Sequence, residues 1–337
     1  MDPFALARSL IDIESVTGSE KAVGEFLFAR LSELAAGTGG TVERMEVSPE
    51  RFNVLATWGK PIVTLSTHID TVPPFFPSSE DNEFIRGRGA CDAKGIIAAM
   101  ISAADKLLAG DTRNFGLLFV VGEEKDSLGA LCAAKDSRGS SFVINGEPTE
   151  NKLARGSKGA LRYMFTARGR LAHSAYPELG ESAIEKLLDV LADIRKVPLP
   201  QNALLGKSTL NIGTISGGCA PNVIADEAHA ELMFRTVDDP APIRAALSAV
   251  VNGRGELKEM LHTPALQLET MDGFETTVVA YTTDIPNFDG AWGKPFLIGP
   301  GSIHVAHAAE ERIPKQQLLD AIGIYTRITQ QLVAGAH

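Results

Sequence analysis

The chain has 337 residues, of which 44% are hydrophobic and 22% charged, and this length suits two domains better than one simple core. Its formal net charge is −10, which disfavours nucleic acid or an anionic membrane as the main partner. We therefore expect an ordinary globular protein with no nucleic-acid and no membrane partner.

The first part of the chain alternates helical and strand patterns. Residues 17–37 predict a helix, because Thr17 and Glu20 have the spacing of a capping box, apolar residues recur at helical intervals, and Gly37 ends the run. A second helix is predicted at residues 95–108. The strand-type runs are residues 54–57, 62–67, 115–121 and 142–144. Strands that alternate with helices imply α/β layers with a largely parallel sheet.

The middle of the chain changes character from about Gly156. It predicts strand, helix, strand, strand and helix, in that order, at residues 159–168, 181–194, 209–216, 227–234 and 242–251. This order is typical of a compact α+β insert of the split βαβ, or ferredoxin-like, kind. A strand at residues 296–298 and a helix at residues 315–332 then return to the first pattern. The fold class is therefore α/β, with a discontinuous first domain (residues 1–155 and 265–337) and an inserted domain (residues 156–264).

The cysteines and the N-terminal residues indicate the cellular compartment in which the protein is expected. Cys91, Cys132 and Cys219 are widely spaced and show neither a disulfide framework nor zinc-finger spacing, which fits a reducing environment. The first residues lack the basic start and apolar run of a signal peptide, and no apolar stretch is long enough to span a membrane. The sequence predicts a cytoplasmic protein.

Polar side chains that bind metals follow the predicted strands of the first domain. The carboxyl ends of parallel strands meet at one edge of a sheet, so groups placed there are expected to lie together. One further carboxylate, Asp92, stands just before the helix at residues 95–108. The groups that follow strands are His68 and Asp70, then Glu123 and Glu124, then Glu147, and finally His304 and His307.

Such a set of imidazoles and carboxylates suits two divalent metal ions. Zinc accepts both ligand types, and two neighbouring ions need a bridging carboxylate. Asp70 is placed to accept the second ring N–H of His68 and so to fix its tautomer. In the Glu123-Glu124 pair, one carboxylate can bind metal while the other takes a proton from the attacking water. Each residue alone fits a capping or surface role better, but their joint order on strand ends favours a metal site.

These segments resemble the peptidase M20 family of metallohydrolases, which includes acetylornithine deacetylase, succinyl-diaminopimelate desuccinylase, carboxypeptidase G2 and the aminoacylases. The resemblance covers nearly the whole chain. It rests on residues 68–74 (HIDTVPP), 87–95 (GRGACDAKG), 123–124 (EE), 146–149 (GEPT) and 299–307 (GPGSIHVAH). The resemblance implies a zinc-peptidase-like catalytic α/β domain with an inserted lid and dimerisation domain.

The resemblance also implies the roles of the metal-site residues. His68 would bind one ion and His307 the other, with Asp92 as the bridge. Glu124 and Glu147 would each bind one ion, and Glu123 would be the general base and acid. Zinc is expected in both positions, with cobalt or manganese as alternatives. Ala306-His307, followed by Glu310, fits the family's last motif better than His304, although an Ile-His pair in the desuccinylase pattern leaves His304 open.

Four further residues would bind substrate or stabilise the developing charge. His173 resembles the lid histidine that reaches the partner subunit's active site and helps to bind the substrate carbonyl. Arg235 would hold the substrate carboxylate, a task suited to a guanidinium. Asn222 and Thr283 would contact substrate. The resemblance thus implies a homodimer formed through the lid domain.

Three functions compete on this sequence. The favoured one is hydrolysis of an N-acyl amino acid, as in acetylornithine deacetylase, because the insert is compact and a Gly-Pro-Gly-Ser turn lies near His307. The second is a dipeptidase or carboxypeptidase of the same family. The third is a metal-free relative that serves as a binding or scaffold protein, which the intact ligand positions and Glu123 oppose.

Overall fold

The computed structural model describes residues 2–335, and the chain divides into two compact units. Unit 1 comprises Met1–Arg155, Leu268–Thr277 and Thr283–His337, and unit 2 comprises Gly156–Gln267 and Val278–Thr282. The predicted first domain includes residues 1, 336 and 337, which lie outside the described part. Residues 265–267 and 278–282, which the sequence pattern assigns to the first domain, belong to unit 2.

Unit 1 is built on a six-stranded mixed sheet. In sheet order its strands are β1 (Thr41–Ser48), β2 (Arg51–Trp58), β6 (Phe115–Val120), β3 (Val63–His68), β7 (Phe142–Asn145) and β19 (Lys294–Leu297). The last four run parallel to one another, whereas β1 and β2 form an antiparallel edge. The parallel strands therefore direct their carboxyl ends to one edge, as the sequence pattern predicts.

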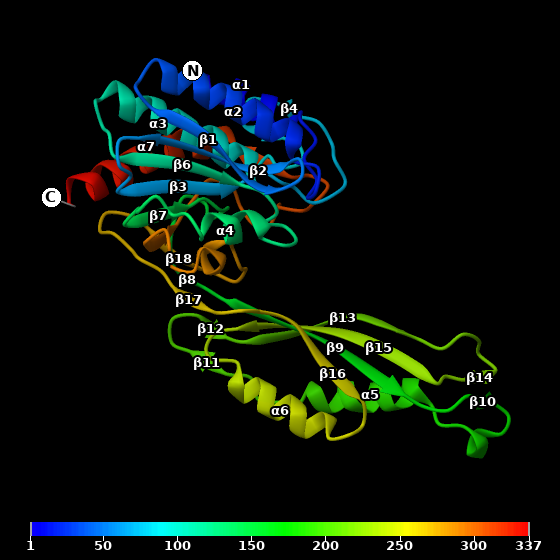
Figure 1. Ribbon diagram of the computed structural model, residues 1–337. Coiled ribbons are helices and arrows are strands. Elements are labelled where there is room, and N and C mark those ends of the chain that lie inside the picture. Colours follow the sequence, from blue (N-terminus) through cyan, green and yellow to red (C-terminus); the bar gives the residue numbers. More distant parts are fainter. Residues whose placement is uncertain (1, 336–337) are drawn as a thin grey trace. The chain divides into compact units, whose positions relative to one another are not determined.

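Helices cover both faces of this sheet, and alternate residues of each strand point to opposite sides. In β2, Val54 and Ala56 belong to the core under four helices, while Leu55 belongs to the core on the other face. Figure 1 shows the four helices on one side of the sheet, namely α1 (Pro3–Ile11), α2 (Lys21–Ala36), α3 (Lys94–Ala109) and α7 (Lys315–Ala334). The other face is covered by α4 (Leu128–Ala133) and the 3-10 helix η2 (Ile285–Phe288).

The capping-box prediction for Thr17 is wrong. Helix α2 begins at Lys21, and its N-cap residue Glu20 makes no side-chain cap hydrogen bond. Instead, the Thr17 hydroxyl donates to Asp70 Oδ2 at 2.7 Å, and the fully buried Glu20 carboxylate pairs with Arg51 at 2.8 Å. Both side chains form long-range contacts that compete with a local cap. The predicted end at Gly37 is confirmed.

Unit 2 is an antiparallel sheet with two helices on one face. Its strands, in sheet order, are β13 (Thr209–Gly217), β15 (Glu227–Thr236), β9 (Gly159–Arg168) and β16 (Glu256–Thr263). Its core lies between this sheet and the helices α5 (Ala183–Ile194) and α6 (Ala241–Val251). Along the chain the order is βαββαβ, which is the ferredoxin-like arrangement. The predicted fold class is confirmed, although the sequence pattern missed β16.

The remaining elements are short. They are β4 (Ser79–Glu80), β5 (Phe84–Arg86), β8 (Leu153–Ser157), β10 (Ala172–His173), η1 (Pro177–Leu179), β11 (Gln201–Asn202), β12 (Gly206–Lys207), β14 (Val223–Ile224), β17 (Leu266–Gln267), β18 (Thr276–Val279) and β20 (Arg312–Pro314). Among the helices of residues 2–335, none has the length and apolar character needed to cross a membrane.

Candidate active site

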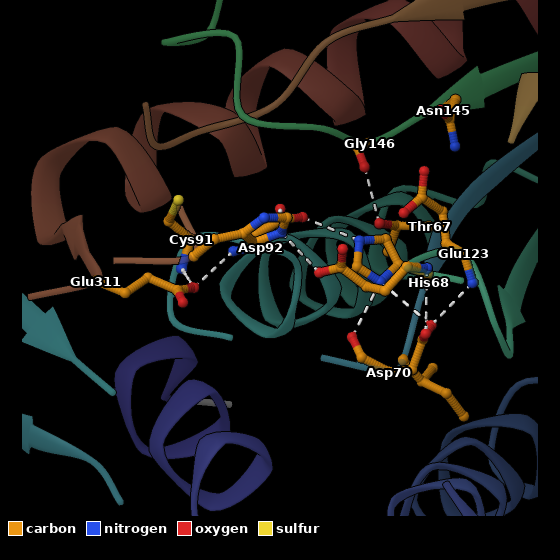
Figure 2. Close-up of polar contacts among 12 residues, drawn as sticks. Thr67, His68, Asp70, Cys91, Asp92, Glu123, Asn145, Gly146 and Glu311 are labelled. Carbon is orange, nitrogen blue, oxygen red and sulfur yellow. Dashed lines mark hydrogen bonds and ion pairs between the residues drawn. The ribbon is translucent and has the colours of Figure 1, made fainter. Parts of the chain in front are cut away.

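Segments far apart in the sequence meet at the carboxyl edge of the unit 1 sheet. His68 is the last residue of β3, Glu123 and Glu124 follow β6, and Glu147 follows β7. Asp92 precedes α3 and lies beside His68, as Figure 2 shows. The sheet thus gathers at one place the groups that the sequence offers separately.

Asp92 lies between two imidazole rings. Its Oδ1 is 2.9 Å from His68 Nε2, and its Oδ2 is 3.3 Å from His307 Nε2. Burial alone would raise the pKa of Asp92, but hydrogen bonds from His307 and His68 hold it well below its usual value. A carboxylate whose two oxygens face two different histidines has the arrangement that a bridging metal ligand needs.

Glu124 completes a compact group of donor atoms. Its Oε1 lies 2.9 Å from His307 Nε2. Ligand atoms of His68, Asp92 and Glu124 all lie within 4.8 Å of one another, a spacing that can hold a metal ion. The chemistry of this donor set, imidazole nitrogen with carboxylate oxygen, fits zinc and neighbouring divalent transition metals.

Two more carboxylates lie in the site, of which Glu147 is buried and Glu123 half-buried. Burial, reinforced by the negative charge of Glu147, raises the pKa of Glu123 well above its usual value. Burial also raises the pKa of Glu147, which is 4% exposed and whose Oε1 has no hydrogen-bond partner within the described part of the chain. Buried carboxylates in such a cluster repel one another, so the site favours the binding of cations.

Asp70 holds both His68 and the loop after β6. His68 Nδ1 lies 3.0 Å from the Asp70 carbonyl oxygen and 3.5 Å from Oδ1, so the main chain makes the closer contact. The Asp70 carboxylate accepts hydrogen bonds from the backbone N–H groups of Gly122, Glu123 and Glu124, at 3.0, 3.1 and 3.2 Å. With Nδ1 donating to Asp70, Nε2 of His68 remains for a metal. Gly122 has φ +86°, a turn conformation that favours glycine.

The structure separates the two histidines of the last motif. His307 contacts both Asp92 and Glu124, whereas no hydrogen bond or ion pair joins His304 to another residue of the described chain. His307 adopts φ +62°, the left-handed region, which non-glycine residues rarely occupy outside turns and functional sites. The geometry therefore supports His307 as the last ligand.

The predicted substrate residues of unit 2 lie in two places: His173 and Asn222 at the two-stranded sheet β10–β14, and Arg235 in the four-stranded sheet. His173 in β10 pairs with Val223 in β14, and the Ser174 N–H donates to the Asn222 carbonyl at 3.0 Å. Both His173 and Asn222 are exposed. Arg235 lies near the opposite end of β15, where it pairs with Thr209 and Ala160, and burial lowers its pKa.

Thr283 and its neighbour Asp284 are buried in unit 1. Thr283 Oγ1 accepts a hydrogen bond from the Ile285 N–H at 3.2 Å, at the start of η2. Asp284 is 1% exposed, and burial raises its pKa to about 7. Its charge raises the pKa of Glu123 and Glu147. Asp284 is not among the site residues predicted from the sequence, where its only signal is a carboxylate next to Thr283.

The metal-free protein is expected to lose thermal stability as pH rises from about 6.5 to about 10. Hydrogen bonds to Asp92 and Glu124 raise the pKa of His307 from 6.5 to about 10. The folded state therefore binds a proton that the unfolded state releases above pH 6.5. The resulting stability is present in full below that pH and is lost as pH passes through the folded pKa. Thermal midpoints measured in chelator from pH 6 to 10 test this.

The exposed His304 provides a matched control for this pH dependence. Because other groups titrate in the same window, the informative quantity is the difference between variants. His307→Asn should flatten the decline in the thermal midpoint, and His304→Asn should leave it as in the parent protein. An unchanged decline in His307→Asn would contradict the prediction.

Comparisons with known proteins identify relatives of this chain. Residues 155–257 match the model of the peptidase dimerisation domain of M20. The chain is 40% identical to a peptidase M20 domain-containing protein of Schizosaccharomyces pombe, over 96% of this chain and 83% of that protein. It is 37% identical to an Aspergillus niger protein named probable carboxypeptidase, over 99% and 91% of the two chains.

One solved structure shows the same fold over both units. An M20 family metallo-carboxypeptidase from Sulfolobus solfataricus superposes with a TM-score of 0.80 at 17% identity and covers 98% of this chain and 99% of its own. The likeness at this identity concerns the fold. The family follows from the identity to the fungal relatives over nearly the whole chain: this protein belongs to the peptidase M20 family, whose members are metal-dependent hydrolases of amide bonds.

Proposed function

We propose that the protein is a two-metal carboxypeptidase or dipeptidase, which releases the C-terminal amino acid of a short peptide. The observation that carries the proposal is the position of Asp92 between His68 and His307, with the half-buried Glu123 in the same site. The names of the A. niger and S. solfataricus proteins support this substrate class.

The chain offers two ligand sets that share Asp92. The contact of 2.9 Å between Glu124 and His307 favours these two residues as one set, which leaves His68 and Glu147 for the other ion. The group of His68, Asp92 and Glu124 then spans both metal positions. When bound, two such ions lower the pKa of the attacking water and polarise the amide carbonyl. Zinc is the expected metal, with cobalt or manganese as alternatives, because all three accept imidazole and carboxylate ligands.

Glu123 would move the proton. Its carboxylate takes a proton from the attacking water and later gives it to the leaving amine. Burial raises the pKa of Glu123, and a raised pKa favours a carboxylate that both accepts and returns a proton. The Asp70 carboxylate fixes the Glu123 backbone through its N–H group and so orients this base.

Arg235 would hold the C-terminal carboxylate of the substrate. It lies on the sheet face opposite α5 and α6, because its neighbour Phe234 belongs to the core under those helices. Burial removes water from the Arg235 guanidinium and so lowers its pKa. A substrate carboxylate bound there would replace the hydrogen bonds lost with that water. Holding the carboxylate would restrict the positions that the adjacent amide of the substrate can take.

We further propose a homodimer formed through unit 2. Its match to the dimerisation-domain model supports self-association. His173 and Asn222 lie near one end of the sheet and Arg235 near the other, roughly 20 Å apart at the usual rise of a strand. Groups so far apart on one unit are suited to two different active sites. His173 would then help to stabilise the oxyanion in the partner subunit.

An N-acyl amino acid is the second candidate substrate class. It shares with a peptide the carboxylate next to the amide, so Arg235 suits both. The compact insert and the turn at residues 299–302 favour an acetylornithine deacetylase-like activity. The fungal relatives shift the preference to peptides.

We expect chelator-treated protein, reloaded with zinc, to release amino acids from dipeptides and tripeptides faster than amine from N-acetyl and N-succinyl amino acids. Amine release, with and without added zinc or cobalt, measures this. Each peptide has a matched control in its C-terminal amide. The amide should react about 10–100-fold more slowly, because a hydrogen bond to a charged group contributes about 1.5–3 kcal/mol.

The possible outcomes separate the candidates. Metal-dependent release from N-acyl amino acids alone would replace the peptidase proposal by the deacylase. Equal rates on acid and amide would remove Arg235 from its proposed role. Protein that binds no metal would favour the hypothesis of a metal-free relative that serves as a binding or scaffold protein.

A further inference from the structure

A buried ion pair between Arg88 and Glu311 contacts the main chain at Asp92. Arg88 and Glu311 have side chains only 2% and 1% exposed, and Arg88 Nη1 donates to Glu311 Oε2 at 2.7 Å. Arg88 also donates through Nε to the Pro74 carbonyl at 3.2 Å, and its guanidinium lies 4.8 Å from the centre of the Phe76 ring. The pair is fully enclosed, so its charges must be satisfied by these protein groups.

The second oxygen of Glu311 binds the backbone of the Asp92 loop. Its Oε1 accepts hydrogen bonds from the N–H groups of Cys91 and Asp92, both at 3.2 Å (Figure 2). Both carboxylate oxygens of Glu311 are thus used, one by the guanidinium and one by the two amides. Glu311 therefore contacts the main chain of Asp92, whereas the Asp92 side chain faces His68 and His307.

Glu311 also joins two ligand-bearing segments. It stands four positions after His307, immediately before β20, and β20 pairs with β5, which ends just before Gly87. The Gly87 N–H donates to the Glu311 carbonyl at 3.2 Å. The segment that carries His307 and the segment that carries Asp92 are therefore tied by main-chain and side-chain contacts at one residue.

Stability alone does not explain such a pair. Apolar side chains of similar volume in place of a buried ion pair are often neutral or stabilising, so a buried pair is weak evidence for a stabilising role. Here the pair provides what apolar groups lack, an acceptor that fixes two backbone N–H groups. Altering a group that holds a metal ligand in its orientation typically lowers metal affinity about 10–100-fold.

We propose that Glu311, held by Arg88, is a positioning residue that fixes Asp92 relative to His307 and so sets the spacing of the two metal positions. The inference rests on the proposed two-metal site. Without Glu311, one ion can still bind through His68 and Glu147, but the shared use of Asp92 by two ions is weakened.

Zinc titration of metal-free protein tests this without any substrate. Glu311→Ala should bind the first zinc ion within about threefold of the parent protein and the second about 10–100-fold more weakly. Glu310→Ala is the matched control, because Glu310 is adjacent and its side chain is 83% exposed. It should bind both ions like the parent. A merely structural role would lower the thermal midpoint and leave both affinities of the folded protein unchanged.

A double variant guards against misfolding. Glu311→Ala leaves Arg88 buried without its partner, which can unfold the protein. Arg88→Met combined with Glu311→Met removes both charges at similar volume and should fold, yet it should show the same loss of second-ion affinity. Folded variants that bind two zinc ions like the parent overturn the positioning role alone. Parent protein that binds fewer than two ions overturns the two-metal site as well.

Discussion

Replacing Glu123 by Gln is expected to lower turnover by about 10²–10⁴-fold while both metal ions stay bound. Glutamine keeps the shape of the side chain but cannot accept the proton of the attacking water. The Glu123 backbone is held by the Asp70 carboxylate at 3.1 Å, a contact that the substitution leaves in place. The measurements are kcat on the best peptide substrate and metal content by mass spectrometry.

The neighbouring Glu124 provides the contrast. Its Oε1 lies 2.9 Å from His307 in the group that can hold a metal, so Glu124→Gln should lower zinc affinity as well as turnover. The two variants carry the same chemical change at adjacent positions. If Glu123→Gln keeps parental turnover, or if it loses a metal ion as Glu124→Gln does, the assignment of Glu123 as the base and Glu124 as the metal ligand is wrong.

The fold class could be predicted because local patterns match the buried faces of the elements. In β2 and β6 alternate residues enter two different cores, and α5 carries a clear apolar face. Strand β16 was missed for a physical reason. It lies at a sheet edge, it is mostly exposed, and an irregularity between Glu259 and Leu261 breaks its alternation.

The residues of the candidate site likewise fall into those that could be predicted from the sequence and those that could not. Groups on strand ends, such as His68 and Glu147, could be named from the sequence because parallel strands share one edge. The contacts that support these groups could not be predicted from the sequence, because no local pattern relates the segments that they join. Arg88 and Glu311 are separated by 223 positions, and Thr17 reaches Asp70 from a loop that the sequence assigns to a helix cap.

The second large effect is expected when two inactive variants are combined. Homodimers of Glu123→Gln lack the base, and homodimers of His173→Ala should lose about 10²–10³-fold in kcat, as for removal of one oxyanion donor. If His173 acts in the partner subunit, a mixed dimer contains one site with Glu123 from one chain and His173 from the other. Its second site lacks both groups.

Random reassortment should therefore restore about a quarter of parental activity, because half of the dimers are mixed and each has one intact site. Co-expression with two different affinity tags yields the mixed dimer directly, and its kcat per dimer, the measured quantity, should be about half of the parental value because one of its two sites is intact. The positions of His173 and Arg235 at opposite ends of the unit 2 sheet are the physical reason to expect this result. A purified mixed dimer without regained activity would mean that His173 serves its own subunit, and a His173→Ala homodimer with parental kcat would mean that His173 has no part in the reaction. Either result would contradict a dimeric active site.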